Sequence, residues 1–341
     1  MTIPTHTTRP ALPTVRLGRT GPLVSALGLG AMGMSDFYGT AATRDDEESV
    51  ATIQAAVDAG VTFINTGDFY GMGHNERLVG RALAGGRRDG VTLSVKFGAL
   101  RTPRGGWSGF DGRHAAVKNF AAYSLDRLGV DVIDLYQPAR VDPAVPLEET
   151  IGAIADLIAE GTVRHLGVSE MDAAQLRRAH AVHPVTALEI EWSLATRVVE
   201  GELLDTAREL GIGIVAYGAL SRGLLAQPTI AEYAPTDFRA HLPRFAPEHR
   251  DRNAARVARL HALAAAHGMT GAQLALAWVM ARGDDVVTLV GTTNRRRLAE
   301  NVTATSLVLP PSLLATLDEE FGADAFAGTR YDAFGMRMVV N

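Results

Sequence analysis

Polar side chains stand where apolar segments of this sequence end, and their types are those of a proton-transfer site. The stretch NTGDFYG follows VTFI and contains Asn65, Asp68 and Tyr70, and the next apolar run, VTLSVKFG, contains Lys96. An uncompensated lysine is costly to bury in such a run, which favours a function for it. Free tyrosine has a pKa of about 10, and a buried ammonium group beside it is expected to lower that pKa. Tyr70 and Lys96 are therefore candidates for a catalytic acid and its partner.

Other apolar runs end in polar residues too. In chain order these are Gln137, Arg140, Ser169, Glu189 and Tyr217. If the runs are parallel strands, their carboxyl ends meet at one face, which is where barrel enzymes build their sites.

Eight short runs are apolar on nearly every residue. They are VSALGLGAM, VTFIN, VTLSVKFG, DVIDLYQP, VRHLGVS, VTALEIEW, GIGIVAYGAL and VVTLVGT. Such runs suit strands that are buried on both faces. Between them lie amphipathic segments such as TRDDEESVATIQAAVDAG, in which a capping box from Thr43 to Asp46 is predicted. This alternation predicts an α/β fold, a (β/α)8 TIM barrel, and not a doubly wound sheet.

No Pro/Gly/Ser-rich linker divides the chain, so we expect one barrel domain over residues 15–325 with an N-terminal β-hairpin. Residues 1–14 are expected to form a disordered tail, and residues 326–341 a C-terminal tail whose position the sequence does not decide. Two insertions, 98–112 and 221–253, follow strands and are predicted to be long loops at the C-terminal face.

The string GLGAMG (28–33) matches the dinucleotide fingerprint G-x-G-x-x-G. That fingerprint works only when its last glycine opens a helix and an acid ends the next strand. Here MSDFYGTAA follows, and the next strand ends in Asn65. We therefore do not expect a Rossmann site.

Composition excludes several functions. The 341 residues have a net charge of −5, without a basic stretch for nucleic acid or membrane lipid, and contain no cysteine for disulfides or thiolate ligands. His180 and His183 lack a third ligand nearby, so no metal site is expected. No apolar run reaches the ~18 residues of a membrane span. With no signal-peptide pattern at the N-terminus, we expect a cytoplasmic protein.

Ten strings spread along the chain carry a more specific signal. They are LGRTG, GLGAM, TGDFYGMGHNERLVGRAL, SVKFG, SLDRLGVDVIDLYQ, GTVRHLGVS, VAYGALSRGLL, LPRF, QLALAW and VGTTNRRRLAEN. Together they resemble the aldo-keto reductase superfamily, in its bacterial NADPH-dependent branch. The resemblance implies a barrel that binds NADPH/NADP+ in extended form and reduces aldehydes or ketones of small molecules by hydride transfer. It also implies Tyr70 as the catalytic acid and Lys96 as its partner.

The resemblance implies a set of cofactor-binding residues. Those at the nicotinamide end are Gly30, Ala31, Ser169, Glu189 and Tyr217, of which Tyr217 would stack on the ring and Ser169 would hold the carboxamide. Those at the pyrophosphate are Gly218, Leu220 and Arg222, and those at the 2′-phosphate and adenosine are Gly291, Thr292, Arg297, Glu300 and Asn301. A guanidinium group facing a phosphate favours NADPH over NADH.

Two of the four catalytic positions depart from the family pattern. Asn65 stands in place of the acid that pairs with Lys96, and Ala139 in place of a histidine. Asn65 can keep a hydrogen bond to the ammonium group but not its charge balance. The pKa of Lys96 should therefore fall, and Tyr70 should feel a stronger pull toward the phenolate.

Three further consequences follow from these departures. Glu170 and Glu189 stand where the family has amides, so Glu189 should accept from the carboxamide without donating to it. His74, Arg140 or a substrate group could substitute for the missing histidine. Weakened or specialised activity is therefore expected.

Two alternatives stay open beside carbonyl reduction. One is a weakly catalytic or non-catalytic NADP(H)-binding or sensing protein, which the changed positions favour. The other is a different redox reaction in the same pocket, such as double-bond reduction or sugar alcohol oxidation. The physiological substrate and the reaction direction are not fixed by the sequence, and a homo-oligomer through the C-terminal tail is left open.

Overall fold

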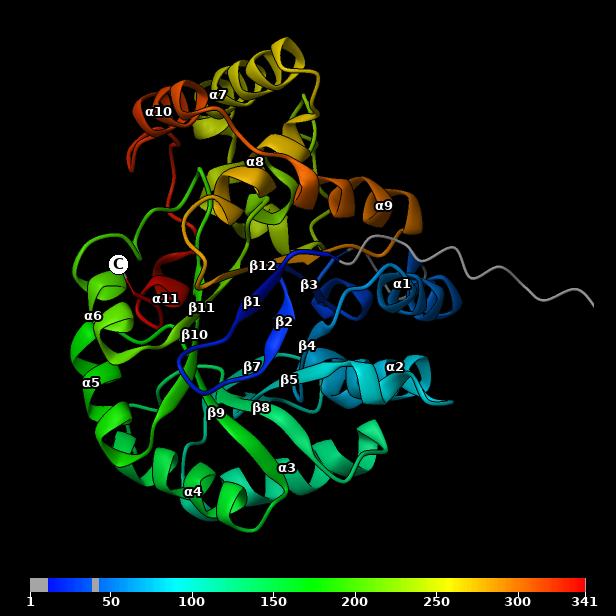
Figure 1. The fold of residues 1–341 in the computed structure, drawn as a ribbon, viewed down its shortest axis with the longest axis vertical. Helices are drawn as coiled ribbons and strands as arrows, with labels where there is room; N and C mark the ends of the chain where they lie inside the picture. Colours follow the sequence, from blue (N-terminus) through cyan, green and yellow to red (C-terminus); the bar gives the residue numbers. More distant parts are fainter. Residues whose placement is uncertain (1–11, 39–42, 341) are drawn as a thin grey trace, which may run out of the picture.

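Eight parallel strands close into a barrel in the computed structural model, which describes residues 12–38 and 43–340 (Figure 1). In order around the barrel they are β3 (Leu27–Gly30), β4 (Phe63–Gly67), β5 (Thr92–Phe97), β8 (Ile133–Pro138), β9 (Val163–Ser169), β10 (Val185–Glu191), β11 (Gly213–Tyr217) and β12 (Val286–Gly291). Each of the eight apolar runs overlaps one of these strands. The predicted (β/α)8 fold is confirmed.

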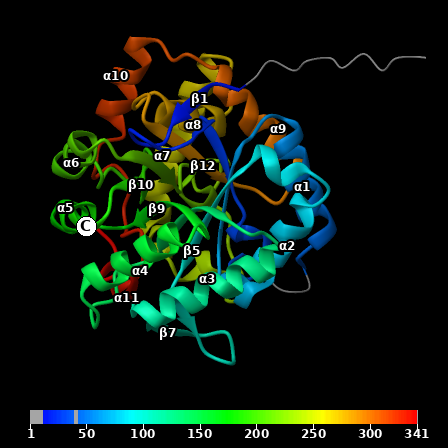
Figure 2. The ribbon, with the colours of Figure 1, turned by 60° about the horizontal axis from the view of Figure 1, so that its bottom comes forward.

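Helices surround the barrel on its outer side (Figures 1 and 2). They are α1 (Asp46–Asp58), α2 (His74–Leu83), α3 (His114–Leu128), α4 (Leu147–Ala159), α5 (Ala173–Val182), α6 (Glu202–Leu210), α8 (Gly271–Met280) and α9 (Arg295–Thr303). Three more, α7 (Pro247–Ala266), α10 (Pro311–Glu320) and α11 (Ala333–Met336), lie outside the strand–helix alternation.

The cap of α1 differs from the prediction. Asp45 is the N-cap residue, and its carboxylate accepts from the backbone N–H of Glu48 at 2.9 Å. The predicted capping box from Thr43 to Asp46 is therefore wrong. Asp45, two residues after Thr43, is itself a good N-cap residue and takes that position. True capping boxes occur at α5, from Asp172, and at α8, from Thr270.

The two insertions contain more regular structure than predicted. Residues 98–112 hold an antiparallel hairpin of β6 (Ala99–Arg101) and β7 (Trp107–Phe110). Residues 221–253 hold short 3₁₀ turns and the first two turns of α7. Both insertions nevertheless follow barrel strands, β5 and β11, at the predicted face.

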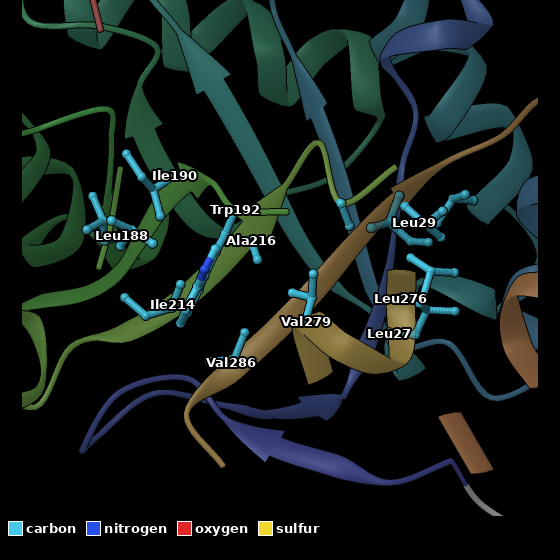
Figure 3. Close-up of a cluster of buried hydrophobic side chains, with 14 of the residues drawn as sticks. Leu27, Leu29, Leu188, Ile190, Trp192, Ile214, Ala216, Leu276, Val279 and Val286 are labelled. Carbon is cyan, nitrogen blue, oxygen red and sulfur yellow. The ribbon is translucent and has the colours of Figure 1, made fainter. Parts of the chain in front are cut away.

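The core has two layers. Between the barrel and its helices, Val279 of α8 lies near Val286 of β12, and Leu276 of the same helix lies near Leu27 and Leu29 of β3 (Figure 3). Inside the barrel floor, Leu17 is fully buried with Phe63 and neighbours from other strands. Leu17 begins the turn between β1 (Thr14–Arg16) and β2 (Leu23–Ser25). These two strands form the predicted N-terminal hairpin, which closes the floor of the barrel.

Both chain ends bear on the tail predictions. Most of the predicted 1–14 tail lies outside the described residues, but Thr14 already belongs to β1. At the other end, the chain after α10 returns to the barrel mouth, where the Val340 backbone N–H donates to Glu170 at 3.1 Å. No helix within 12–38 and 43–340 is long and apolar enough to cross a membrane.

Candidate active site

Tyr70 lies at the mouth of the barrel, three residues after β4. It opens a 3₁₀ turn (η3, Tyr70–Gly73) and is 5% exposed, with Phe37 and Phe69 packed edge-on against its ring at centroid distances of 5.2 and 4.7 Å. The Lys96 ammonium group is 5.4 Å from the centre of the ring. Among the described residues the Tyr70 hydroxyl has no hydrogen-bond partner, so it is available to a ligand.

Lys96 is held by two side chains from other strands. Its Nζ donates to Asn65 Oδ1 at 2.5 Å and to Glu189 Oε1 at 2.8 Å. Asn65 Nδ2 in turn donates to Glu189 Oε2 at 2.7 Å, and Gln137 Nε2 donates to the same oxygen at 2.5 Å. The parallel register brings these positions level, since Lys96 pairs with Gly67 of β4 and Gln137 of β8.

The expected loss of charge balance at Lys96 is therefore wrong. Glu189, a residue 93 positions further along the chain, supplies the carboxylate that Asn65 lacks. The sequence places Glu189 on the cofactor's carboxamide, whereas the structure places both of its oxygens in the Lys96 network. The sequence offered one signal for this role, a glutamate at an inward-pointing position of β10. Its partner Lys96 lies on β5, across the barrel, and no sequence pattern connects the two.

The protonation states at the mouth follow from burial. Burial lowers the pKa of Lys96, as expected, although Glu189 opposes this. Burial raises the pKa of Tyr70 well above its usual value, and the negative charge of Glu189 raises it further. The expectation that Lys96 lowers the pKa of Tyr70 is wrong for this structure, because desolvation of the phenolate outweighs the pull of a cation that is already paired. Tyr70 is a phenol at neutral pH.

A second buried cluster of charges lies beside the first. Glu170 accepts both guanidinium nitrogens of Arg330, at 2.8 and 2.7 Å, and the Tyr217 hydroxyl at 2.8 Å. Glu191, fully buried, pairs with Arg222 at 3.0 Å and with Arg244 at 3.5 Å. The two buried carboxylates of this cluster, Glu170 and Glu191, are thus matched by arginines.

The C-terminal segment contributes to this cluster. Arg330 is 3% exposed, and the hydroxyl of Tyr331 lies 3.1 Å from that of Tyr217. The Arg222 guanidinium lies 4.6 Å from the centre of the Tyr331 ring. Sequence analysis did not identify Arg330 or Tyr331, since no local pattern distinguishes them from other residues of the tail.

The residues present fit a nicotinamide dinucleotide at two separate places. At the mouth, Ser169 Oγ is buried and has no partner in the described structure, as expected of a hydroxyl that awaits a ligand group. Gly30 and Ala31 end β3 beside Asn65, with the Ala31 N–H bonded to the Asn65 carbonyl at 2.9 Å. Gly218 and Leu220 follow β11 and are half-buried.

The second place is the end of β12 and the start of α9. Its members are Gly291, Thr292, Arg297, Glu300 and Asn301, the predicted 2′-phosphate and adenosine contacts. Arg297 is exposed and has no ion pair with any residue of 12–38 or 43–340, whereas Glu300 accepts from Thr270 at 2.7 Å. Arg295 pairs with Glu48 at 2.9 Å, so part of the cation cluster is already balanced.

Arg222, predicted at the pyrophosphate, turns its side chain inward to Glu191. Only the backbone of its loop is then left to face a phosphate. The loop has unusual dihedral angles, with φ of 45° at Ser221 and 56° at Arg222. These left-handed angles belong to a tight turn, in which the N–H groups of Ser221 and Gly223 are bonded to the carbonyls of Gly218 and Leu220.

The candidates to replace the missing histidine are now distinguishable. Both ring nitrogens of His74 are engaged, with Ser35 at 2.9 Å and Asp46 at 3.0 Å. Ala139 is buried against Tyr70, and Arg140 follows it directly. The described part of the chain gives Arg140 no carboxylate partner, only the carbonyl of Ala139 at 2.5 Å. Of the two side chains considered, Arg140 and not His74 is therefore the candidate that remains.

The chain matches the model of the Aldo/keto reductase family over residues 26–320. It belongs to that family. This aldo-keto reductase is thus an NADP-dependent oxidoreductase, and NADPH/NADP+ is its cofactor.

Solved structures agree with this assignment. The glycerol dehydrogenase of Gluconobacter oxydans is 26% identical with a TM-score of 0.82, covering 93% of this chain and 98% of its own. An aldo/keto reductase of Klebsiella pneumoniae, solved with NADP and acetate, is 28% identical with a TM-score of 0.71, covering 94% and 98%. An aldo-keto reductase of Bacillus halodurans, at 24% identity and a TM-score of 0.74 over 94% and 99%, shows the shared fold.

Proposed function

We propose that this aldo-keto reductase reduces an aldehyde or ketone group of a small molecule, with Tyr70 as the proton donor. The observation that carries the proposal is the buried Tyr70 hydroxyl, which has no partner among the described residues and is kept protonated by its surroundings. When bound, NADPH supplies the hydride. A carbonyl oxygen that receives negative charge needs a proton, and a neutral phenol at the mouth can give it.

The surrounding residues prepare this transfer. Lys96 lies under the ring and stabilises the phenolate that remains after the proton has left, and Glu189 and Asn65 hold Lys96 in place. Ser169 and Tyr217 are proposed to position the nicotinamide. Arg140 is proposed to meet the carbonyl oxygen or an anionic group of the substrate, because it is a cation without a carboxylate partner in the described structure.

Alcohol oxidation is a second candidate, and one comparison favours it. The similar structure from Gluconobacter oxydans is a glycerol dehydrogenase. Oxidation requires Tyr70 as a phenolate base, and its raised pKa makes that form scarce at neutral pH. We therefore propose reduction as the principal direction near neutral pH, with oxidation increasing as the pH rises.

The test follows the loss of NADPH absorbance with a panel of aldehydes and ketones. The change of Tyr70→Phe should lower kcat by about 10²–10⁴-fold and leave NADPH affinity unchanged. Tyr136→Phe is the matched control, because Tyr136 is also buried and its hydroxyl donates, among the described residues, to the carbonyl of Val117. Wild-type turnover in Tyr70→Phe would contradict the role of Tyr70. NADPH binding without turnover of any carbonyl would favour the sensing alternative.

A further inference from the structure

We propose that Glu189 is the positioning residue of Lys96, so that the carboxylate of the catalytic site has moved from β4 to β10. The inference rests on the proposed function, since it concerns the group that keeps Lys96 charged and in place during proton transfer. It also explains why position 65 carries an amide.

The contacts support a dedicated arrangement of four residues. Glu189 is 3% exposed and accepts three hydrogen bonds, one from the Lys96 ammonium group at 2.8 Å, one from Asn65 at 2.7 Å and one from Gln137 at 2.5 Å. Asn65 is 2% exposed and has its oxygen on Lys96 and its nitrogen on Glu189. Each group presents the atom that its neighbour requires.

Position 65 cannot be an acid while position 189 is one. An aspartate there would place a second carboxylate oxygen at the 2.7 Å contact with Glu189, where two acceptors repel unless one binds a proton. Conversely, a glutamine at 189 would leave the buried Lys96 beside amides only. The two substitutions are therefore expected to be tolerated together and costly apart.

Other titratable or charged groups also act on Lys96 and Tyr70, and they are unchanged in the variants compared below. Tyr70 and Asp68 follow β4, Arg140 follows β8, and Tyr331 comes from the C-terminal segment. Burial and Glu76 keep the pKa of Asp68 well above its usual range, and within the described structure Asp68 forms no ion pair with Lys96. Arg140 adds to the positive charge that Glu189 must balance.

The experiment compares wild type, Glu189→Gln, Asn65→Asp and the double variant. The pH profile of kcat/KM with NADPH in excess reports the ionisation of the free enzyme. In Glu189→Gln the basic limb should move to lower pH by about one unit or more, because the ionised form of Lys96 and the neutral form of Tyr70 both lose the negative charge that favours them. The double variant should return the limb toward its wild-type position.

The alternative role of Glu189 predicts a different result. If Glu189 contacts the cofactor's carboxamide, Glu189→Gln changes the Kd of NADPH and leaves the basic limb in place, and Asn65→Asp restores nothing. Either finding would overturn the proposal. Asp134→Asn is the matched control, since Asp134 is a buried carboxylate bonded to Arg88 and Arg164 at the start of β8, away from the mouth. It should lower thermal stability without moving the limb.

Thermal unfolding of the same four proteins separates this proposal from the proposed function. If wild type reduces no carbonyl, the proposed function fails, but the charge exchange is still tested. A double variant more stable than the weaker single variant supports the exchange, because it restores one carboxylate beside Lys96. Losses of stability that simply add would overturn it.

Discussion

Arg297 presents a guanidinium group at the start of α9 that has no ion pair in the described part of the chain. An arginine that meets a phosphate forms charge-assisted hydrogen bonds worth about 1.5–3 kcal/mol. Arg297→Ala should therefore raise the Kd of NADPH roughly 10- to 100-fold and leave that of NADH nearly unchanged. Fluorescence titration with both nucleotides measures this. Arg296→Ala, an exposed neighbour of equal charge, is the control, and equal losses for both nucleotides would contradict the assignment.

Glu191 makes the stability of the fold depend on pH. Burial alone would raise its pKa, but the charges of Arg222, Arg330 and Arg244 outweigh burial and lower the pKa to about 2 from the usual 4.5. Because the pKa of Glu191 is lower in the folded than in the unfolded protein, its carboxylate stabilises the fold at pH values above the unfolded-state pKa. That contribution is lost as the pH falls toward 2. The shift corresponds to roughly 3 kcal/mol.

Glu191→Gln tests this at acidic pH. The variant should be less stable than wild type at pH 7, because three arginines lose their carboxylate. Its free energy of unfolding should then fall less steeply than that of wild type between the two pKa values. Urea denaturation at a series of pH values measures both slopes, and parallel acid limbs would contradict the buried ion cluster.

At the same scale, the sequence could predict residue types but not all partners. Tyr70, Lys96 and Ser169 lie where strand-end reasoning places them, because parallel strands bring their carboxyl ends together. Glu189 and Lys96 are joined across the barrel, and no spacing along the chain encodes that contact. The pKa values of Lys96 and Tyr70 depend on how deeply each side chain is buried, and burial cannot be obtained from the sequence alone.

The β6–β7 hairpin forms an aromatic wall next to the site. Trp107 packs against Phe37 and Phe69, each at 5.9 Å between ring centres, and both of these touch Tyr70. Arg101 fastens the hairpin by donating to the carbonyl of Phe69 at 3.0 Å. This element thus covers the aromatic residues that pack against Tyr70, and we propose that the substrate contacts it.

Trp107→Ala should raise KM for aromatic aldehydes about three- to tenfold, since an aromatic pair contributes about 0.5–1.5 kcal/mol. The kcat should change little, because Trp107 does not touch the Lys96 network. Tyr123→Ala, an exposed aromatic of α3, is the control. An equal effect on small aliphatic aldehydes would show that the hairpin acts on the fold and not on the substrate.

Elements were predictable to the extent that their signals are local. The apolar runs identify every barrel strand, because a strand buried on both faces must be apolar throughout. The β6–β7 hairpin escapes this reasoning since its strands are short and mostly half-buried or exposed, with Arg101 and Trp107 paired next to its turn. The N-cap of α1 was misplaced because several capping residues stand in a row.

For the molecule as a whole, the C-terminal segment ties the last part of the chain to the centre of the barrel. Arg330→Ala should lower the free energy of unfolding by about 3–5 kcal/mol, since it leaves Glu170 buried without its cation. Chemical denaturation measures the loss. Arg337→Ala, an exposed arginine of the same segment, should change stability by less than about 0.5 kcal/mol. Equal losses in the two variants would show that the Arg330–Glu170 pair does not hold the C-terminal segment to the barrel.

The Arg330–Glu170 pair spans 160 residues, and this separation has a consequence for the chain as it is made. A ribosome adds about 5–20 residues each second, so Glu170 emerges on the order of ten seconds before the arginine that neutralises it. During that interval Glu170, directly after β9, is an acid without the arginine that pairs with it in the folded protein. The barrel mouth is then the last part of the nascent protein to close, and a prematurely terminated chain would expose it.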